Sequence, residues 1–572
     1  MWVVEIQNEE RKSPVSDYAR TALMEMLTTA ASGPDLAGAL ESVAGQRPVL
    51  DVLIEGLGPV VSTLLQVTLG LGGCTAAGTV SLGQAEEQLR TSGRELMRAT
   101  LQAVVDAASA AQERVPGGVD GPDGVPRTRV EDDHTRTVAT VFGRIAVDRL
   151  AYRAPGVCNV HPLDEVLDLP DGLYSAGLAR LSAREAVRGS FTEAADAVEY
   201  VTGVRIGTRQ LIELTRAAAL DVAGYYTARQ APAADPGDAL VITADGKGIP
   251  VRPEALRAGT AKLAAKAKAK ATSPGATSGN AGGKGNSKRM AELVCVYDLK
   301  PVPRTVEDIL PTLPTNDGAD HTDGVDGADG DQQAPTKAPK AAGKWLTASV
   351  TDDIPTVIAA GFDEAPRRDP GHARDWVALV DGNCTQIDAI TAEAATRSVK
   401  VTVLIDWLHV AGYVWDAAKA FFCTDTTAGM ALARDWVHER SRLILQGDAD
   451  QVAERIRARV LGSKLTAAQR KSALEAATYL TNKAPHLDYP TALTKGWPIA
   501  TGVIEGACRH LVKDRLELGG ARWGLETADA VLALRATVTN GDFDDYWRYH
   551  QQQEHHRTYP AGSSQASLTP AA

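Results

Sequence analysis

Three short apolar runs in this chain are each followed by an aspartate. The runs and their aspartates are 239–244 with Asp245, 376–380 with Asp381, and 401–405 with Asp406. Their length and β-branched content predict buried strands. The carboxyl ends of strands in an α/β sheet open on a shared crevice, so we expect these aspartates to converge. Carboxylates completed by water and phosphate suit Mg²⁺ or Mn²⁺ better than zinc, and the chemistry predicted is phosphodiester cleavage or transfer.

A fourth acidic residue lies in a motif near the end of the chain. In the segment 501–515, Glu505, Arg509 and Lys513 are spaced four residues apart. On a helix this spacing places a carboxylate and two cations on one face. A carboxylate beside a metal and cations beside phosphates would form one wall of an active site.

The order of the predicted elements suggests how these residues are positioned. After the first strand come two strands able to return antiparallel, then a helix, a strand, a helix and a strand: 293–297, 345–350, 354–362, 376–380, 386–396 and 401–405. This is the strand order of a ribonuclease H-like fold. The predicted class is α/β, with a ribonuclease H-like catalytic domain that carries a helical insertion, preceded by a mainly helical N-terminal region with a helix-turn-helix-like segment.

The helix-turn-helix-like segment begins at a capping box, Ser190–Glu193, and a second helix begins near Thr208. If that second helix enters the major groove, Arg205, Arg209 and Gln210 would face phosphates or base edges. The alternative is an ordinary pair of antiparallel helices within a helical domain.

Two low-complexity inserts, 255–291 and 315–343, interrupt the α/β region, and we expect both to be loops because neither has enough apolar residues to form a core. The first is rich in lysine, including Lys262, Lys266, Lys268 and Lys270. These cations either contact a DNA backbone or belong to a solvated linker.

Composition limits the possible functions. The 572 residues carry a formal net charge of −12, which excludes a protein that coats nucleic acid over its whole surface, so any DNA contact must be local. The six cysteines contain no CxxC pair, which supports neither a zinc ribbon nor a disulfide framework and indicates a reducing cytoplasm. The uncharged stretch 56–73 contains glycines and polar residues, and a buried helix is favoured there over a membrane span.

Composition shifts and turn clusters divide the chain into six predicted regions. They are a helical N-terminal region (1–125), a β-hairpin with the helix-turn-helix-like segment (126–235), the catalytic core (236–423), a helical insertion (424–500), the glutamate helix with C-terminal helices (501–550) and a disordered tail (551–572).

Several motifs together resemble those of the ISKra-type insertion-sequence transposases, relatives of the Mutator-like DDE enzymes. They are Asp245-Gly-Lys-Gly, Leu379-Val-Asp-Gly-Asn, Ile405-Asp-Trp-Leu-His-Val, Gly502-Val-Ile-Glu-Gly-Ala-Cys-Arg-His, Ala521-Arg-Trp and Asn540-Gly-Asp-Phe-Asp-Asp-Tyr-Trp. The resemblance covers residues from about 130 to 550.

The resemblance implies a Mg²⁺- or Mn²⁺-dependent DNA transposase whose catalytic and metal-binding residues are Asp245, Asp381 and Glu505. A further family element falls on Asp406 and His409. We expect Asp406 and His409, together with Arg509 and Lys513, to bind phosphate or to orient the metal-binding carboxylates. The implied partners are transposon terminal repeats, target DNA and further copies of the chain, at the nucleoid and without a membrane.

Two other functions remain open. One is a ribonuclease H-like nuclease that hydrolyses DNA without strand transfer. The other is a non-catalytic DNA-binding protein descended from a transposase, which would use the helix-turn-helix-like segment and the basic insert alone.

Overall fold

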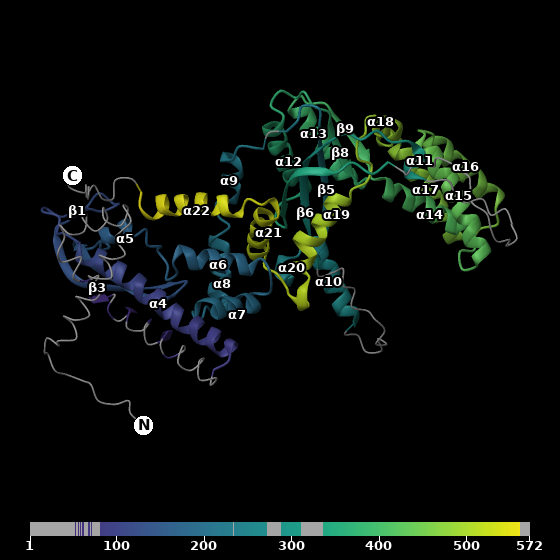
Figure 1. The fold of residues 1–572 in the computed structure, drawn as a ribbon. Helices are drawn as coiled ribbons and strands as arrows, with labels where there is room; N and C mark the ends of the chain where they lie inside the picture. Colours follow the sequence, from purple (N-terminus) through teal and green to yellow (C-terminus); the bar gives the residue numbers. More distant parts are fainter. Residues whose placement is uncertain are drawn as a thin grey trace, which may run out of the picture. The chain divides into compact units, whose positions relative to one another are not determined.

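The computed structural model describes residues 80–560 except 233, 272–287 and 311–335, together with scattered positions between 52 and 70. The chain forms two compact units. Unit 1 comprises Met1–Asp221 and Trp547–Ala572, and unit 2 comprises Val222–Tyr546. Element labels are those of Figure 1.

Unit 1 combines a long helix, two antiparallel strand pairs and four short helices. Its elements are α4 (Leu82–Ala110), β1 (Val119–Asp120), β2 (Pro126–Arg127), β3 (Arg129–Thr140), β4 (Gly143–Arg153), α5 (Pro162–Val166), α6 (Ala176–Ala186), α7 (Phe191–Thr202) and α8 (Thr208–Ala217). The antiparallel pairing of β3 with β4 confirms the hairpin expected in region 126–235. Val105 of α4 packs against Val138 and Val147 of the hairpin in one buried cluster.

The helices α6, α7 and α8 share a second core, which includes Leu178, Val198 and Leu211. The predicted capping box at Ser190 is present, because its side chain accepts a hydrogen bond from the backbone of Glu193 while the glutamate side chain accepts one in return. Gly203 ends α7 in the left-handed conformation at φ 70°, which glycine adopts without a steric penalty.

Unit 2 is built around a mixed five-stranded sheet with the strand order β7-β6-β5-β8-β9. Its strands are β5 (Ala239–Pro250), β6 (Lys288–Leu299), β7 (Ala341–Ser349), β8 (Trp376–Val380) and β9 (Val401–Ile405). The first three strands pair antiparallel, and β8 and β9 continue parallel to β5. This is an α/β fold with the strands and pairing directions that the sequence predicted.

Helices lie on both faces of the sheet. On one face, Gly361 of α12 (Ile354–Arg368) approaches Ile242 of β5 so closely that a Cβ there would lie 3.6 Å from the isoleucine side chain. On the other face lies the π-helix η4 (Cys508–Lys513), since Cys508 contacts Asp245. Asp245 is an odd number of residues from Ile242, and side chains alternate along a strand, so the two point to opposite faces.

The remaining elements of unit 2 are helical and are seen in Figure 1 around and beside the sheet. They are α9 (Val222–Ala228), η1 (Pro253–Ala255), α10 (Ala258–Ala271), α11 (Val306–Ile309), α13 (Cys384–Thr396), α14 (Trp407–Phe421), α15 (Thr427–Leu445), α16 (Ala449–Gly462), α17 (Ala467–Lys483), η3 (Ala484–His486), α18 (Tyr489–Thr494), α19 (Gly502–Ala507), α20 (Asp514–Leu516), η5 (Leu518–Gly520) and α21 (Leu525–Asn540). Helix α22 (Phe543–Thr558) contains the boundary between the units.

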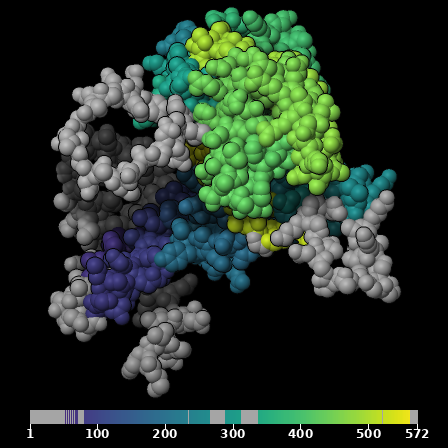
Figure 2. Space-filling view, turned by 90° about the vertical axis from the view of Figure 1, so that its right-hand side faces the viewer, coloured from purple at the N-terminus to yellow at the C-terminus, as the bar shows by residue number. Residues whose placement is uncertain are grey.

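Helices α14 to α17 gather into a bundle beside the sheet, and Figure 2 shows its outer surface. The bundle packs through small residues, because Ala473, Ala476 and Ala477 of α17 are all fully buried. Helices α15 to α18 fall in the region 424–500, for which the sequence predicted a helical insertion.

Four expectations need correction. Strand β5 does not end at Asp245 but continues to Pro250, because β6 pairs with it along its whole length. The lysine-rich insert is not entirely a loop, since its alanine and lysine residues have high helix propensity and form α10. Strands β6 and β7 begin inside the predicted inserts, at Lys288 and Ala341. The expected disordered tail begins too early, because α22 continues to Thr558.

Some expectations fall outside the described residues. These are most of 1–79, including most of the stretch 56–73, the centre of each insert, and the tail beyond 560. Among the helices that are described, none has the length and hydropathy needed to cross a bilayer.

Candidate active site

The register of the sheet aligns the three aspartates at one edge. Thr243 of β5 pairs with Leu379 of β8, and Val380 pairs with Ile405 of β9. Continuing that register places Asp245 beside Asp381, and Asp381 beside Asp406. The prediction that the three aspartates share one edge of the sheet therefore holds.

Asp245 is half-buried within β5. One carboxylate oxygen accepts a hydrogen bond from the backbone N–H of Gly246 at 2.7 Å, and the other accepts one from the thiol of Cys508 at 3.3 Å. Burial, followed by the charge of Asp245, raises the pKa of the Cys508 thiol, which therefore stays protonated and able to donate.

Asp381 directly follows β8 and is half-buried. Its Oδ1 accepts a hydrogen bond from the backbone of Asn383 at 2.9 Å, while its backbone carbonyl accepts one from the hydroxyl of Tyr479 at 3.3 Å. Gly382 has φ 95°, and a Cβ there would lie 2.6 Å from the Tyr479 hydroxyl. A glycine after Asp381 is therefore required both by the backbone conformation and by the approach of α17.

Asp406 is fully buried, and hydrogen bonds occupy its carboxylate. Oδ1 caps α14 by accepting from the backbone of Leu408 at 2.6 Å. Oδ2 accepts from the backbone N–H of Thr501 at 3.0 Å and also from the Thr501 hydroxyl. Because Thr501 immediately precedes α19, this contact ties the helix that carries Glu505 to the edge of the sheet.

Glu505 and His409 are both exposed. Among the described residues, they and Asp406 are the only group of three or more acidic, histidine or cysteine side chains close enough together to hold a metal. One ligand atom from each residue lies within 4.8 Å of the others. Glu505 and His409 also line a surface pocket of about 330 Å³ with Tyr413 and Asp416. The predicted set of Asp245, Asp381 and Glu505 does not meet this distance, so Glu505 lies nearer to Asp406 than the sequence suggested.

Arg509 and Lys513 are exposed, as expected, but they lie in the π-helix η4. A π-helix has more residues per turn than an α-helix, so the argument for one shared face, which assumed α-helical spacing, does not apply here. The wider turn follows Glu505 by three residues and brings Cys508 against Asp245. Such turns are frequent at functional sites.

A further carboxylate, Glu292, was missed by sequence reasoning. It lies on β6 opposite Gly246 and is 7% exposed, and no hydrogen-bond partner for its side chain occurs among the described residues. A Cβ on Gly246 would lie 2.8 Å from its Oε2. Burial raises the pKa of Glu292, and the charges of Asp245 and Asp381 add to this rise while that of Arg257 opposes it. The available signal was a glutamate inside an apolar strand, paired with the glycine that follows the first aspartate.

The donor set of this edge suits a hard divalent cation. Asp381 Oδ2 and both carboxylate oxygens of Glu505 have no hydrogen-bond donor among the described residues, and Asp245 accepts only from a backbone amide and a thiol. Glu292 adds a carboxylate whose pKa is raised by burial and, to a smaller extent, by Asp245 and Asp381, and a bound cation would favour its charged form. Asp406 fits a supporting role better, because its oxygens already accept three hydrogen bonds.

The residues predicted to contact DNA in unit 1 are exposed around the start of α8. The side chain of Arg209 is 92% exposed and pairs with Glu213 at 3.2 Å. The Gln210 side-chain oxygen is already used to cap α8, accepting from Gly207 at 3.0 Å, so only its amide N–H groups remain for a base edge. Arg205 is exposed just before the helix.

Of the predicted basic contacts in the insert, Lys262 is exposed on α10. The side chains of Lys266, Lys268 and Lys270 lie outside the described residues. No protein-family model matches the chain, and no curated protein matches it either.

Proposed function

We propose that the protein is a metal-dependent DDE-type DNA transposase, which cuts the ends of an insertion sequence and joins them to target DNA. The observation that carries the proposal is the alignment of Asp245, Asp381 and Asp406 on one register line of the sheet, with the Glu505 helix fastened to the same edge. If these aspartates served only as helix caps, nothing would explain why the distant Glu505 is held beside them.

The sheet supports the ribonuclease H-like part of the proposal. Three antiparallel strands followed by two parallel strands, in the order β7-β6-β5-β8-β9, are what the strand order in the sequence predicted for that fold. The helical insertion between β9 and α19 supports the resemblance to ISKra-type transposases, which implies such an insertion before the glutamate.

Divalent ions bound at such an edge would activate a water and stabilise the leaving 3′ oxygen. Asp245, Asp381 and Glu505 are the residues that would hold them. Asp406 holds Thr501 and thereby sets the start of α19, and Cys508 donates to Asp245 and so restricts its rotation. His409 is a poor ligand for Mg²⁺ and is better suited to bind a phosphate or orient Glu505.

The single-residue changes Asp245→Asn, Asp381→Asn and Glu505→Gln test the proposal. Each replaces a carboxylate by a neutral amide of the same shape, so we expect each to abolish Mg²⁺-dependent nicking of a transposon-end duplex while gel-shift binding to that duplex persists. Asp388→Asn, on the exposed side of α13, is the matched control.

Three results would contradict this assignment. Near-wild-type nicking by Asp381→Asn would move the metal site to Asp406, His409 and Glu505. Nicking without joining of the freed 3′ end to target DNA would favour the nuclease alternative. Binding to the duplex with no Mg²⁺- or Mn²⁺-dependent nicking by the wild type would favour the non-catalytic alternative.

A further inference from the structure

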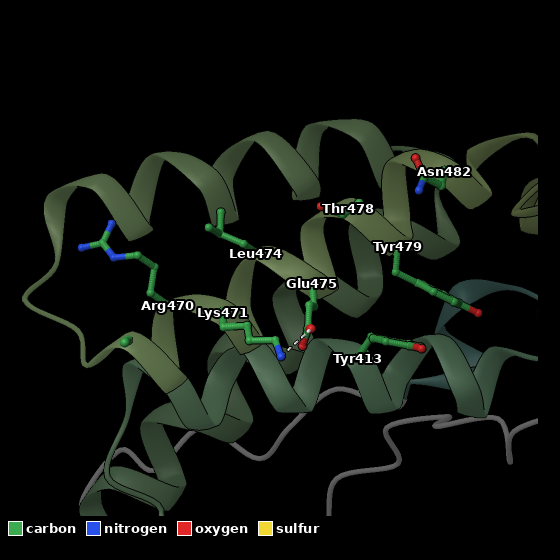
Figure 3. Close-up of a pocket in the computed structure, with 9 residues that line it drawn as sticks. Tyr413, Arg470, Lys471, Leu474, Glu475, Thr478, Tyr479 and Asn482 are labelled. Carbon is green, nitrogen blue, oxygen red and sulfur yellow. Dashed lines mark ion pairs between the residues drawn. The ribbon is translucent and has the colours of Figure 1, made fainter. Parts of the chain in front are cut away.

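An open groove of about 900 Å³ lies on the helical bundle between α14 and α17. Figure 3 shows its lining, with Tyr413 and Tyr479 together at one end and Arg470 toward the other. We propose that this groove binds a segment of single-stranded DNA next to the cleavage site. The proposal rests on the proposed function and names the form of DNA that this part of the protein recognises.

The two tyrosines provide the surface for a base. Their rings are stacked, with centroids 3.8 Å apart and an interplanar angle of 17°. Tyr413 is 36% exposed and the neighbouring Leu474 is 38% exposed, so the groove presents aromatic and apolar surface to solvent. An unpaired base can stack on such a surface whatever its sequence, whereas a base inside a duplex has no free face.

The groove also offers charge for a backbone phosphate. Lys471 and Glu475 form an ion pair at 3.7 Å and largely cancel each other. Arg470 is exposed and has no ion-pair partner among the described residues. It lies nine residues before Tyr479 on α17, or about 13 Å along the helix at 1.5 Å per residue. An extended strand is needed to reach both positions.

The groove adjoins the candidate active site. Tyr413 lines both this groove and the pocket that contains His409 and Glu505. At the same end, the Tyr479 hydroxyl donates to the backbone carbonyl of Asp381. A strand whose phosphate lies at the carboxylates can therefore continue onto the tyrosines without leaving the protein surface.

Fluorescence anisotropy of a labelled single-stranded oligonucleotide, measured on the full-length protein in EDTA, tests the proposal. We expect Tyr413→Ala to weaken binding roughly 5- to 100-fold, the usual range for loss of one base–aromatic stack, and Tyr413→Phe to bind like wild type. Arg470→Ala should lower the slope of log affinity against log salt by about 0.7, the value for one phosphate on a single strand. Arg434→Ala, an exposed arginine of α15, is the matched control.

A second variant keeps the test valid if Tyr413→Ala loosens the bundle. Leu474→Glu places a negative charge in the groove without touching the tyrosine stack, and it should weaken single-strand binding at least 5-fold while duplex binding and melting temperature stay unchanged. Equal binding by wild type, Tyr413→Ala and Leu474→Glu would overturn the proposal.

Nicking in Mg²⁺ separates the two hypotheses. If the wild type nicks DNA normally and these variants bind single strands as well as the wild type does, only the proposal for the groove is overturned. If these variants weaken single-strand binding but the wild type does not nick DNA, only the transposase assignment is overturned.

Discussion

At the scale of single residues, the acidic edge of the sheet holds more negative charge than hydrogen bonds can neutralise. Glu292 is the clearest case, because it is buried, lacks a donor among the described residues and faces the charges of Asp245 and Asp381. On the proposed function, a cation bound at this edge would offset the cost of burying the Glu292 charge.

Glu292→Gln should therefore stabilise the metal-free protein at neutral pH. The pKa of Glu292 is raised in the folded state, so its ionised form opposes folding at every pH above that raised pKa. Below the ordinary value of 4.5 the group is protonated in both states and the penalty disappears. We expect a higher melting temperature than wild type at pH 8 and no difference below about pH 4.5.

The same variant should respond less to metal. Added Mg²⁺ should raise the melting temperature of the wild type more than that of Glu292→Gln, because binding to the folded state alone stabilises it. A melting temperature at pH 8 that falls on substitution would show that Glu292 makes a favourable contact instead.

Thr501 gives a second prediction at this scale, since it connects Asp406 to the Glu505 helix. Thr501→Val removes the hydroxyl donor to Asp406 and leaves the backbone donor. We expect nicking to fall about 10- to 100-fold, the usual loss for a partner that orients a ligand, with no change in the Mg²⁺ concentration for half activity. Thr501→Ser keeps the hydroxyl and should nick like wild type.

At the scale of elements, the lysine-rich helix α10 extends from the β5–β6 hairpin and is the main local source of positive charge expected to meet DNA. Deleting residues 259–289 should weaken binding to all DNA sequences alike and reduce the salt dependence of binding by about 0.9 per lost phosphate contact. A matched deletion of 313–333, in the aspartate-rich insert, should leave the salt dependence unchanged. An unchanged slope after the first deletion would identify α10 as a linker.

The element scale is also where the sequence was most informative. The β-branched runs ending at Asp381 and Asp406 were predicted from local pattern alone, because a buried strand needs an unbroken apolar segment. The end of β5 was misplaced because Gly246 and Gly248 read as a break. In the structure they leave room for the side chains of Glu292 and Met290, and β6 continues the pairing.

Side-chain pairing across distant segments could not be predicted in the same way. The contact of Asp406 with Thr501 and the stack of Tyr413 on Tyr479 join residues brought together only by the fold. The π-helix at Cys508–Lys513 has no local sequence signal that distinguishes it from an α-helix. The contact of Thr501 with Asp406 sets where α19 begins and so holds Glu505 near Asp406.

At the scale of the whole molecule, unit 1 is assembled from two separate parts of the chain. Asp221, at the end of the first part, accepts hydrogen bonds from Arg557 at 2.7 and 2.9 Å and lies 2.6 Å from Nδ1 of the buried His550. Burial raises the pKa of Asp221, but its bonds to Arg557 and His550 outweigh that effect and the net pKa is lowered.

Asp221→Asn should therefore destabilise unit 1 at neutral pH. A lowered pKa contributes stability above the unfolded value of 3.8, and that contribution is lost as the pH falls through the folded value. We expect the melting temperature to fall by several degrees at pH 7, since 1 kcal/mol shifts it by about 2–4 °C in a unit of this size. The difference should shrink below about pH 3.8. The exposed Asp196→Asn on α7 is the control, and equal melting of both variants would contradict the role of the pair.

The long bundle between β9 and α19 also has a consequence for synthesis. On the ribosome, Asp406, the last of the three aspartates of the sheet, emerges about a hundred residues before Glu505, which at typical rates is roughly 5 to 20 s. On the proposed function, each nascent chain spends that interval with an incomplete set of carboxylates. A chain whose translation stops within the bundle is thus a cleavage-incompetent product, so premature termination silences the element without releasing an unregulated nuclease.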